Sequence, residues 1–344
     1  MDSVGNFMVV WVDFRNIHAD IYGQRFNNVG APIGMDFKVN EAPLRNTTND
    51  VAIAMNGSGS FVVVWEAGGS RAASEISGQL YAANGARLGN NFRVNDDPGS
   101  NVQYNPAVAI NDSGKFVVVW VDNRNSKWDI YGQRYDAEGR PQDGNFEVTE
   151  DTSNTYGESY CAVAIDGNGN FVVVWTNQRN EDLKTGIHGR RYDASALPQE
   201  NSFIVNDDAN GTGHSGPAIA MDDSGNFVAV WQDSRNVNSD IYRQLYDSGG
   251  MPQGSNLRVN FDEGSTSQFA PGIAVDDSGN FVVVWEDHRN DIDIYAQPFA
   301  KNGRKVGANY RVNNDSEGKF QGVPDVKLVN KRIYYTWHDT RIEG

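Results

Sequence analysis

The chain has 344 residues and a formal net charge of −16, and its sequence pI is about 4.7. This balance excludes the basic surface that nucleic acid needs, and it disfavours attraction to anionic lipid. The one cysteine, Cys161, excludes an intrachain disulfide. We interpret it as a small buried thiol in a strand. No apolar run approaches the roughly 20 residues that span a bilayer.

The N-terminal segment, residues 1–40, begins inside a phrase that recurs later. Residues 2–7 match the DDSGNF of later segments, and the basic start and long apolar stretch of a signal peptide are missing. We therefore expect that an upstream segment, including any export signal, is absent from this chain.

Seven tryptophans mark a regular repeat, because each ends a phrase similar to FVVVW. Their spacings are 54, 55, 55, 56, 54 and 52 residues. Such a period indicates repeated units that bury their faces on one another. The tryptophans are Trp11, Trp65, Trp120, Trp175, Trp231, Trp285 and Trp337.

One full unit, residues 106–149, predicts four antiparallel strands, which we name A to D. They are PAVAI, the doubly apolar KFVVVW, the half-polar DIYGQRY and FEVT, and short polar turns join them. Five such units lie at about 51–95, 106–149, 161–206, 217–260 and 271–313, with partial units at 1–40 and 323–341.

These repeats predict a single all-β domain over residues 1–344, a β-propeller of four-stranded antiparallel blades. A straight β-solenoid fits less well. Strands A, C and D occur six times and strand B seven times. Six blades are preferred, with the ring closed by pairing of the N- and C-terminal strands, since closure leaves no open sheet edge. Seven blades are the alternative.

The corner between strands B and C reads W-x-D-x-R-N and is followed by D-I-Y. An arginine between two carboxylates makes bidentate hydrogen bonds that fix a loop. We interpret the corner as a structural brace rather than a ring of ligand-binding charges, because an active site needs one asymmetric constellation. It recurs as Asp13/Arg15/Asp20, Asp122/Arg124/Asp129, Asp233/Arg235/Asp240 and Asp287/Arg289/Asp293.

Function is predicted on the face that carries the B–C and D–A loops, because the D–A loops vary between units. Trp128 is a ligand-binding candidate, since it alone lies in a corner and is expected to be more exposed than the repeated tryptophans. Loops or corners of this face also hold His18, His214, His288 and His338, of which the last three are further ligand-binding candidates.

The unit around residue 180 is atypical, with Asn177 in place of Asp and His188 in place of Tyr. His188, Tyr156 (or Tyr160) and Arg190 would suit proton abstraction from a uronate, with the arginine neutralising its carboxylate. We favour the interpretation that His188 is a tolerated substitution in a strand.

The acidic pairs of the D–A loops are weak calcium candidates because carboxylate oxygens are the ligands of hard cations. They are Asp96, Asp97, Asp207 and Asp208. The D-x-D-x-D-G spacing is missing, so solvated acidic loops are the favoured interpretation. No histidine pair has the spacing of zinc ligands.

The phrases VVWVDNRN and DIYGQRYDAEG, followed by FEVT or FRVN, resemble repeats of large bacterial exported and cell-surface proteins. The D-x-S-G-N turns loosely resemble the aspartate box of sialidase-type propellers, and polysaccharide-lyase propellers share the architecture. The resemblance implies an extracellular or cell-surface propeller acting in recognition or adhesion, binding glycan or protein, with no nucleic acid, no membrane insertion and a monomeric module. A polysaccharide lyase or glycoside hydrolase is the alternative, which fold alone does not establish.

Overall fold

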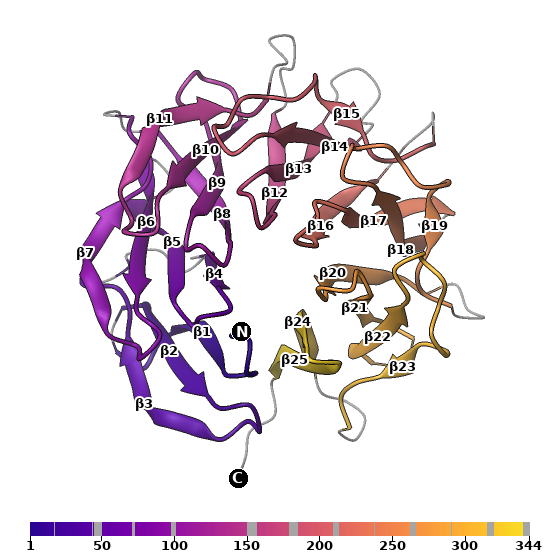
Figure 1. Ribbon diagram of the computed structural model, residues 1–344, viewed down its shortest axis with the longest axis horizontal. Helices are drawn as coiled ribbons and strands as arrows, with labels where there is room; N and C mark the ends of the chain where they lie inside the picture. The colour runs from indigo at the N-terminus through magenta and orange to yellow at the C-terminus, as the bar shows by residue number, and fades with distance from the viewer. Residues whose placement is uncertain are drawn as a thin grey trace. The chain divides into compact units, whose positions relative to one another are not determined.

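The computed structural model describes residues 1–344 except 17, 43, 45–49, 71–72, 98–100, 150–156, 179–184, 209–212, 237, 262–265, 290, 315–319 and 340–344. The regular secondary structure of the described residues consists of 25 β-strands (Figure 1). No helix among them is long and apolar enough to cross a bilayer.

The strands form seven antiparallel sheets, which we number in chain order. Sheet 1 holds β1 (Phe7–Asp13), β2 (Asp20–Phe26) and β3 (Pro32–Lys38), and sheet 7 holds β24 (Gln321–Val329) and β25 (Arg332–Asp339). Sheet 2 holds β4 (Val51–Met55), β5 (Phe61–Ser70), β6 (Ala73–Tyr81) and β7 (Arg87–Arg93). Sheet 3 holds β8 (Gln103–Ile110), β9 (Phe116–Asp122), β10 (Asp129–Tyr135) and β11 (Pro141–Glu147).

The remaining three sheets also have four strands each. Sheet 4 holds β12 (Glu158–Ile165), β13 (Phe171–Gln178), β14 (Thr185–Tyr192) and β15 (Phe203–Ile204). Sheet 5 holds β16 (Ser215–Met221), β17 (Phe227–Asn236), β18 (Asn238–Tyr246) and β19 (Leu257–Arg258). Sheet 6 holds β20 (Gln268–Val275), β21 (Phe281–Asp287), β22 (Asp293–Phe299) and β23 (Tyr310–Arg311).

The sheets are the four-stranded antiparallel blades of a β-propeller, as the sequence predicts. Five are complete, sheet 1 supplies strands B, C and D, and sheet 7 supplies strands A and B. The strand count therefore fits the predicted six-bladed propeller, with strand B present at both ends. Closure of the ring by pairing of the N- and C-terminal strands stays a prediction.

Two compact units divide the chain. The first comprises residues 1–173 and 190–200, and the second comprises residues 174–189 and 201–344, so sheet 4 contributes strands to both.

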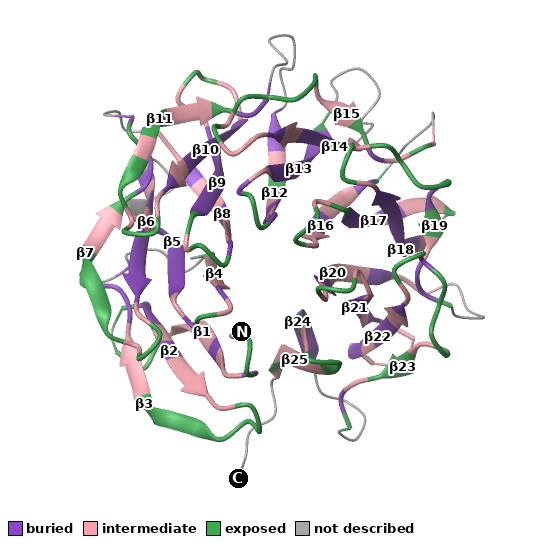
Figure 2. Ribbon diagram, in the orientation of Figure 1, coloured by how far each residue is buried: buried purple, intermediate pink, exposed green. Residues whose placement is uncertain are grey.

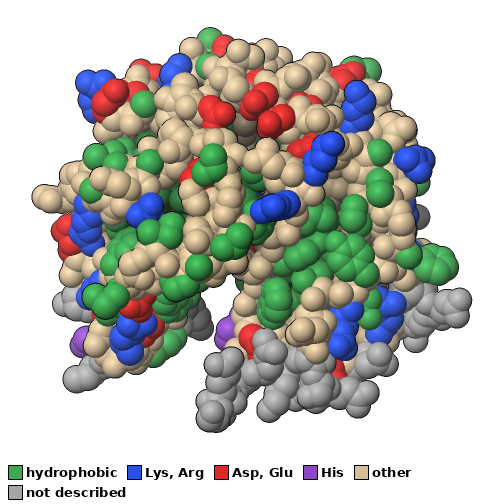
Figure 3. All heavy atoms as spheres, turned by 60° about the horizontal axis from the view of Figure 1, so that its bottom comes forward, with side chains coloured by type: hydrophobic (Ala, Val, Ile, Leu, Met, Phe, Trp, Pro, Cys, Tyr) green, Lys and Arg blue, Asp and Glu red, His purple; other side chains and the backbone are tan. Residues whose placement is uncertain are grey.

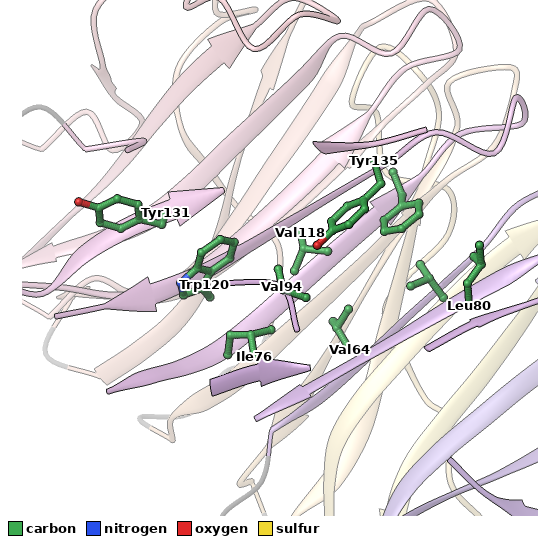
Figure 4. Close-up of a cluster of buried hydrophobic side chains, with 10 residues drawn as sticks. Val64, Ile76, Leu80, Val94, Val118, Trp120, Tyr131 and Tyr135 are labelled. Atoms are coloured by element: carbon green, nitrogen blue, oxygen red, sulfur yellow. The ribbon is translucent and has the colours of Figure 1, made fainter. Parts of the chain in front are cut away.

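Strand B is the core of each complete sheet because its β-branched and aromatic residues are apolar on both faces. All seven residues of β9 are buried, whereas the outer strand β11 has no buried residue (Figure 2). Between sheets 2 and 3, Val62, Val64 and Leu80 pack with Val118, Trp120 and Tyr135 (Figure 4). The repeated phrase thus supplies both sides of an interface between neighbouring sheets.

A buried amide pair joins neighbouring sheets at an equivalent position in three places. Asn145 donates its side-chain N–H to the Val94 carbonyl oxygen of the preceding sheet at 3.2 Å and to Gln133 Oε1 at 2.7 Å. Its Oδ1 accepts the Asp96 backbone N–H at 2.7 Å. The same donation occurs from Asn91 to Val39 and Gln79, and from Asn256 to Val205 and Gln244.

Asn145→Ala is expected to lower the free energy of unfolding by about 2–4 kcal/mol, because several polar groups at the interface lose their partner together. Urea denaturation followed by tryptophan fluorescence measures the change. Glu138→Ala is the matched control: Glu138 forms an exposed ion pair with Arg140, whose loss costs less than about 1 kcal/mol. Equal effects of the two substitutions would contradict the structural role of the amide pair.

Candidate functional site

The predicted brace is present at each of the four repeated corners through its arginine and its first carboxylate. The second predicted carboxylate bonds to other side chains instead, and these residues are Asp20, Asp129, Asp240 and Asp293. In sheet 3, the Trp120 indole N–H donates to Asp122 Oδ2 at 2.9 Å, and Arg124 Nη2 donates to the same oxygen at 2.8 Å. The Arg124 guanidinium carbon lies 4.1 Å from the ring centre of Tyr131, a cation–π distance. The equivalent sets are Trp11/Asp13/Arg15/Tyr22, Trp231/Asp233/Arg235/Tyr242 and Trp285/Asp287/Arg289/Tyr295.

The charges of these corners are satisfied within the protein. The hydrogen bond from Arg15 lowers the pKa of Asp13 to about 2, so the carboxylate is ionised at neutral pH. Asp122, Asp233 and Asp287 are fully buried and each accepts from its own tryptophan and arginine. The recurring Asp and Arg therefore hold the corner, and they are not free to take a ligand.

The acidic pairs proposed for calcium also contact protein donors. Asp96 Oδ1 accepts Arg124 Nη1 at 2.8 Å, and Asp97 accepts amide N–H groups, among them that of Asn95 at 2.6 Å. In sheet 5, Asp207 accepts Arg235 Nη1 at 2.8 Å. These carboxylates link a D–A loop to the corner of the next sheet, and in the described residues their oxygens accept from protein donors.

His214 is the ligand-binding candidate with the most distinctive surroundings. Its side chain is fully buried, and Nε2 lies 3.0 Å from Asp208 Oδ1 and 3.2 Å from Asp233 Oδ2. These contacts are ion pairs rather than well-aligned hydrogen bonds. Nδ1 lies 2.7 Å from the Thr185 carbonyl oxygen, which accepts only if that nitrogen carries a proton.

The position of His214 between two carboxylates favours its imidazolium form. Burial opposes the charge, but Asp233, the Thr185 carbonyl and Asp208 outweigh it, and the pKa of His214 is raised above its usual value. His214, Asp208 and Asp233 have the donor atoms for a metal ion. Because Asp233 Oδ2 already accepts from the Trp231 indole and from Arg235, the fit to a cation is poor.

His18, His288 and His338 lie at loop ends or corners of the predicted face, and each is at least partly exposed. His288 Nε2 is 3.9 Å from Glu286 Oε2, and its ring lies edge-on to Phe269 at 4.8 Å. His338 lies edge-on to Phe320 at 6.0 Å. The structure thus places His288 and His338 beside aromatic rings.

Of the predicted catalytic group of the atypical unit, the structure describes His188, Tyr160 and Arg190. Arg190 is 6% exposed, and its Nη1 donates to the Val148 carbonyl oxygen at 2.9 Å. Arg190 of β14 occupies the position that Gln133 occupies in β10 of sheet 3. Its side chain bonds to the preceding sheet directly, whereas in sheet 3 the Asn145 amide makes the equivalent bond. In this placement Arg190 bonds to the protein backbone, and its role toward a uronate stays a prediction.

The other members of that group have separate surroundings. His188 is half-buried, and its ring packs on Trp175 at 6.0 Å, at the position where sheets 1, 3, 5 and 6 have a tyrosine. This packing fits the favoured interpretation of a tolerated substitution. Tyr156 lies outside the described residues. Cys161 is half-buried in β12, and burial raises the pKa of its thiol to about 12, so the thiol is un-ionised at neutral pH.

Trp128 lies in an aromatic group that the structure assembles from sheets 3 and 4, which we call the aromatic corner. Its ring meets Tyr104 edge-on, with ring centres 5.3 Å apart. Gly157 packs closely against Trp128, because a Cβ added to this glycine would lie 2.3 Å from the Trp128 Cβ. Trp128 is half-buried, whereas Trp120 and Trp175 are no more than 2% exposed. Tyr160, at the start of β12, is 55% exposed.

Exposed aromatic side chains concentrate at the same end of their sheets. Of five among the described residues, four lie at the end with the B–C and D–A loops: Phe14, Tyr160, Phe261 and Phe320. The fifth, Tyr310, lies in strand D. Figure 3 shows hydrophobic side chains reaching the surface among charged ones. Scattered exposed apolar residues are ordinary, but a shared end of several sheets is not.

The sequence analysis did not single out Tyr104, Asp50 or Glu66. Tyr104 and Asp50 lie at the start of a strand A, and Glu66 directly follows a repeated tryptophan. The sequence did contain a signal for Glu66, because the residue after each repeated tryptophan varies between units although the tryptophan itself does not. That residue is Val12, Glu66, Val121, Thr176, Gln232, Glu286 and His338 in turn. In antiparallel register, Tyr104 lies opposite Val121 and Phe269 opposite Glu286.

Comparison with solved structures supports the fold. The chain is similar to a protein of unknown function from Dyadobacter fermentans, with a TM-score of 0.60 and 11% identity over 86% of this chain and 93% of that one. A polysaccharide lyase matches with a TM-score of 0.61 and 10% identity over 99% and 86% of the two chains.

An α-L-arabinofuranosidase from Fusarium graminearum matches with a TM-score of 0.55 and 12% identity over 83% of this chain and 86% of that one. No protein-family model matches the sequence, and no curated protein matches it. At these identities the comparisons establish the propeller fold.

His214→Gln is expected to remove a pH-dependent part of the stability. Because the folded pKa of His214 is raised, its stabilisation is complete below the unfolded pKa of about 6.5 and is lost as pH rises through the folded value. Glutamine occupies the equivalent position in sheets 3, 6 and 7, so the backbone accepts it.

At about pH 5 the variant should be less stable by about 1–3 kcal/mol, and the difference should shrink toward about pH 9. Denaturant midpoints measured across this range test the prediction. His18→Gln, at an exposed site, is the control. A difference between His214→Gln and the parent that stays constant with pH would contradict it.

Proposed function

We propose that this chain is a glycan-recognition propeller that binds sugar chains at the end of its sheets with the B–C and D–A loops and carries out no chemistry on them. The observation that carries the proposal is the position of exposed Phe14 and Tyr160 and half-buried Trp128 at that end of the sheets of the first compact unit. Aromatic rings offer flat apolar faces at low entropic cost, which suits the apolar face of a sugar ring.

The state of the polar groups supports binding rather than catalysis. A catalytic acid or base needs a carboxylate or imidazole that can reach substrate. The buried carboxylates Asp122, Asp233 and Asp287 are committed to tryptophan and arginine, and Arg190 is committed to a neighbouring carbonyl. The charges of the repeated corners are therefore not available to act on a substrate.

The structural neighbours support a carbohydrate ligand by analogy of fold. Besides the lyase and the arabinofuranosidase, an α-L-arabinanase from Penicillium chrysogenum was solved with arabinobiose, and it matches with a TM-score of 0.53 and 11% identity over 89% of this chain and 90% of that one. The resemblance of the repeats to bacterial exported proteins supports a place outside the cell or at its surface.

An array of immobilised plant and microbial polysaccharides, probed with the purified chain, tests the proposal. We expect retention on at least one glycan, and Trp128→Ala should weaken it by at least about tenfold, equivalent to about 1.4 kcal/mol. Tyr160→Asn is a second variant that protects against misfolding, because Tyr160 has a φ of +47° and sheet 3 has Asn105 in the same conformation.

Tyr310→Ala is the matched control, since it removes an exposed aromatic ring away from the loop end. Retention unaffected by either aromatic-corner variant would contradict the proposed site. Release of reducing ends, or of the ultraviolet absorbance of an unsaturated uronate, from a retained polysaccharide would instead establish the alternative, a degrading enzyme.

A further inference from the structure

We propose that the aromatic corner, together with the carboxylates of Asp50 and Glu66, forms a binding site for uncharged glycans and rejects uronate-containing ones. The inference rests on the proposed function and narrows its ligand class. It comes from three observations: where the two carboxylates lie, what the nearby cations contact, and how Tyr160 is presented.

The carboxylates come from the sheet that precedes the aromatic corner. Asp50 directly precedes β4, and Glu66 lies in β5, where its backbone N–H donates to the Asp50 carbonyl oxygen at 3.0 Å. Strand β8, which carries Tyr104, packs against β4 and β5 on one side and against β12, which carries Tyr160, on the other. One strand thus connects the acidic pair to the aromatic rings.

Electrostatic effects agree with this placement. Burial raises the pKa of Tyr104 to about 12, and the groups that add to the effect include Tyr160, Asp50 and Glu66. Asp50 is exposed to solvent, yet the surrounding protein raises the pKa of its carboxyl. Asp50 accepts no side-chain hydrogen bond from the described residues, so its oxygens are available to ligand hydroxyls.

Among the described residues of the first compact unit, the arginines at this end pair with carboxylates of the protein. Arg15 pairs with Asp13 and Asp36 at 2.6 and 2.7 Å. Arg93 pairs with Glu75 at 3.3 Å.

Arg124 pairs with Asp96 and Asp122, both at 2.8 Å. Lys127 directly precedes Trp128, and its charge opposes the rise that burial causes in the pKa of the Glu147 carboxyl. A uronate would have to displace one of these carboxylates, and it would also face the negative charges of Asp50 and Glu66.

An uncharged sugar meets no such cost. Its hydroxyls donate to carboxylate oxygens in charge-assisted hydrogen bonds, and its apolar face packs on an aromatic ring. Tyr160 is positioned for this contact by a backbone with φ of +47°, a conformation that an aromatic residue rarely adopts and that leaves its ring 55% exposed.

Affinity gel electrophoresis with soluble polysaccharides tests the inference. The neutral set is arabinan, xylan and a mixed-linkage glucan; the acidic set is polygalacturonate and alginate; chitosan is the cationic probe. We expect a neutral glycan to retard the chain, and both acidic polymers to bind at least about tenfold more weakly at low salt. Added salt should leave the neutral interaction unchanged.

The double variant Asp50→Asn, Glu66→Gln should weaken the neutral interaction and narrow the gap to the acidic polymers, while Asp143→Asn, an exposed carboxylate at the opposite end of sheet 3, should do neither. Acidic polymers that bind as tightly as neutral ones, or chitosan that binds more tightly in a salt-sensitive way, would overturn the inference while leaving glycan recognition intact. No binding to any polysaccharide would overturn the proposed function and this inference with it.

Discussion

Burial of strand B on both of its faces is the constraint on which the structure depends. A strand such as β9, with seven buried residues, has no stable position unless an apolar surface covers each side. Each unit therefore needs neighbouring sheets, and the chain repeats one phrase because every unit faces the same requirement. The polar contacts follow from this packing: once strand ends are buried, their amides and carboxylates need partners within the protein.

The buried polar positions show which side chains can replace one another at equivalent places in the sheets. The first residue of the A-strand region, opposite the corner carboxylate, is Gln103, Gln268 or Gln321 in three sheets and His214 in another. An amide and a protonated imidazole both donate toward the carboxylate, so either fills the position. They differ in charge, and only one of them responds to pH.

The sequence was sufficient for the repeated features and insufficient for the unique ones. The tryptophan period, the alternation of strands with Gly-rich turns and the Asp/Arg corner recur often enough to predict the propeller and the brace, and the structure confirms both. Arg190 is an example of a unique feature that the sequence did not predict. The sequence suggests a free cation near His188, but the side chain extends to a carbonyl oxygen of the neighbouring sheet. Likewise, Tyr104 and Trp128 are far enough apart in sequence that only packing between a strand start and a corner reveals their contact.

The left-handed residue in strand A has a consequence for how this fold diversifies. Asn105, Tyr160, Gly216, Ala270 and Val323 all occupy it, with φ between +47° and +57°. Asparagine and glycine adopt this conformation readily, whereas a β-branched valine does so at a cost of about 1–3 kcal/mol. Since such different side chains share one main-chain path, the bend is imposed by the sheet and not by the residue that occupies it. The residue at this position can therefore be substituted, in evolution or by design, without a change in the backbone conformation.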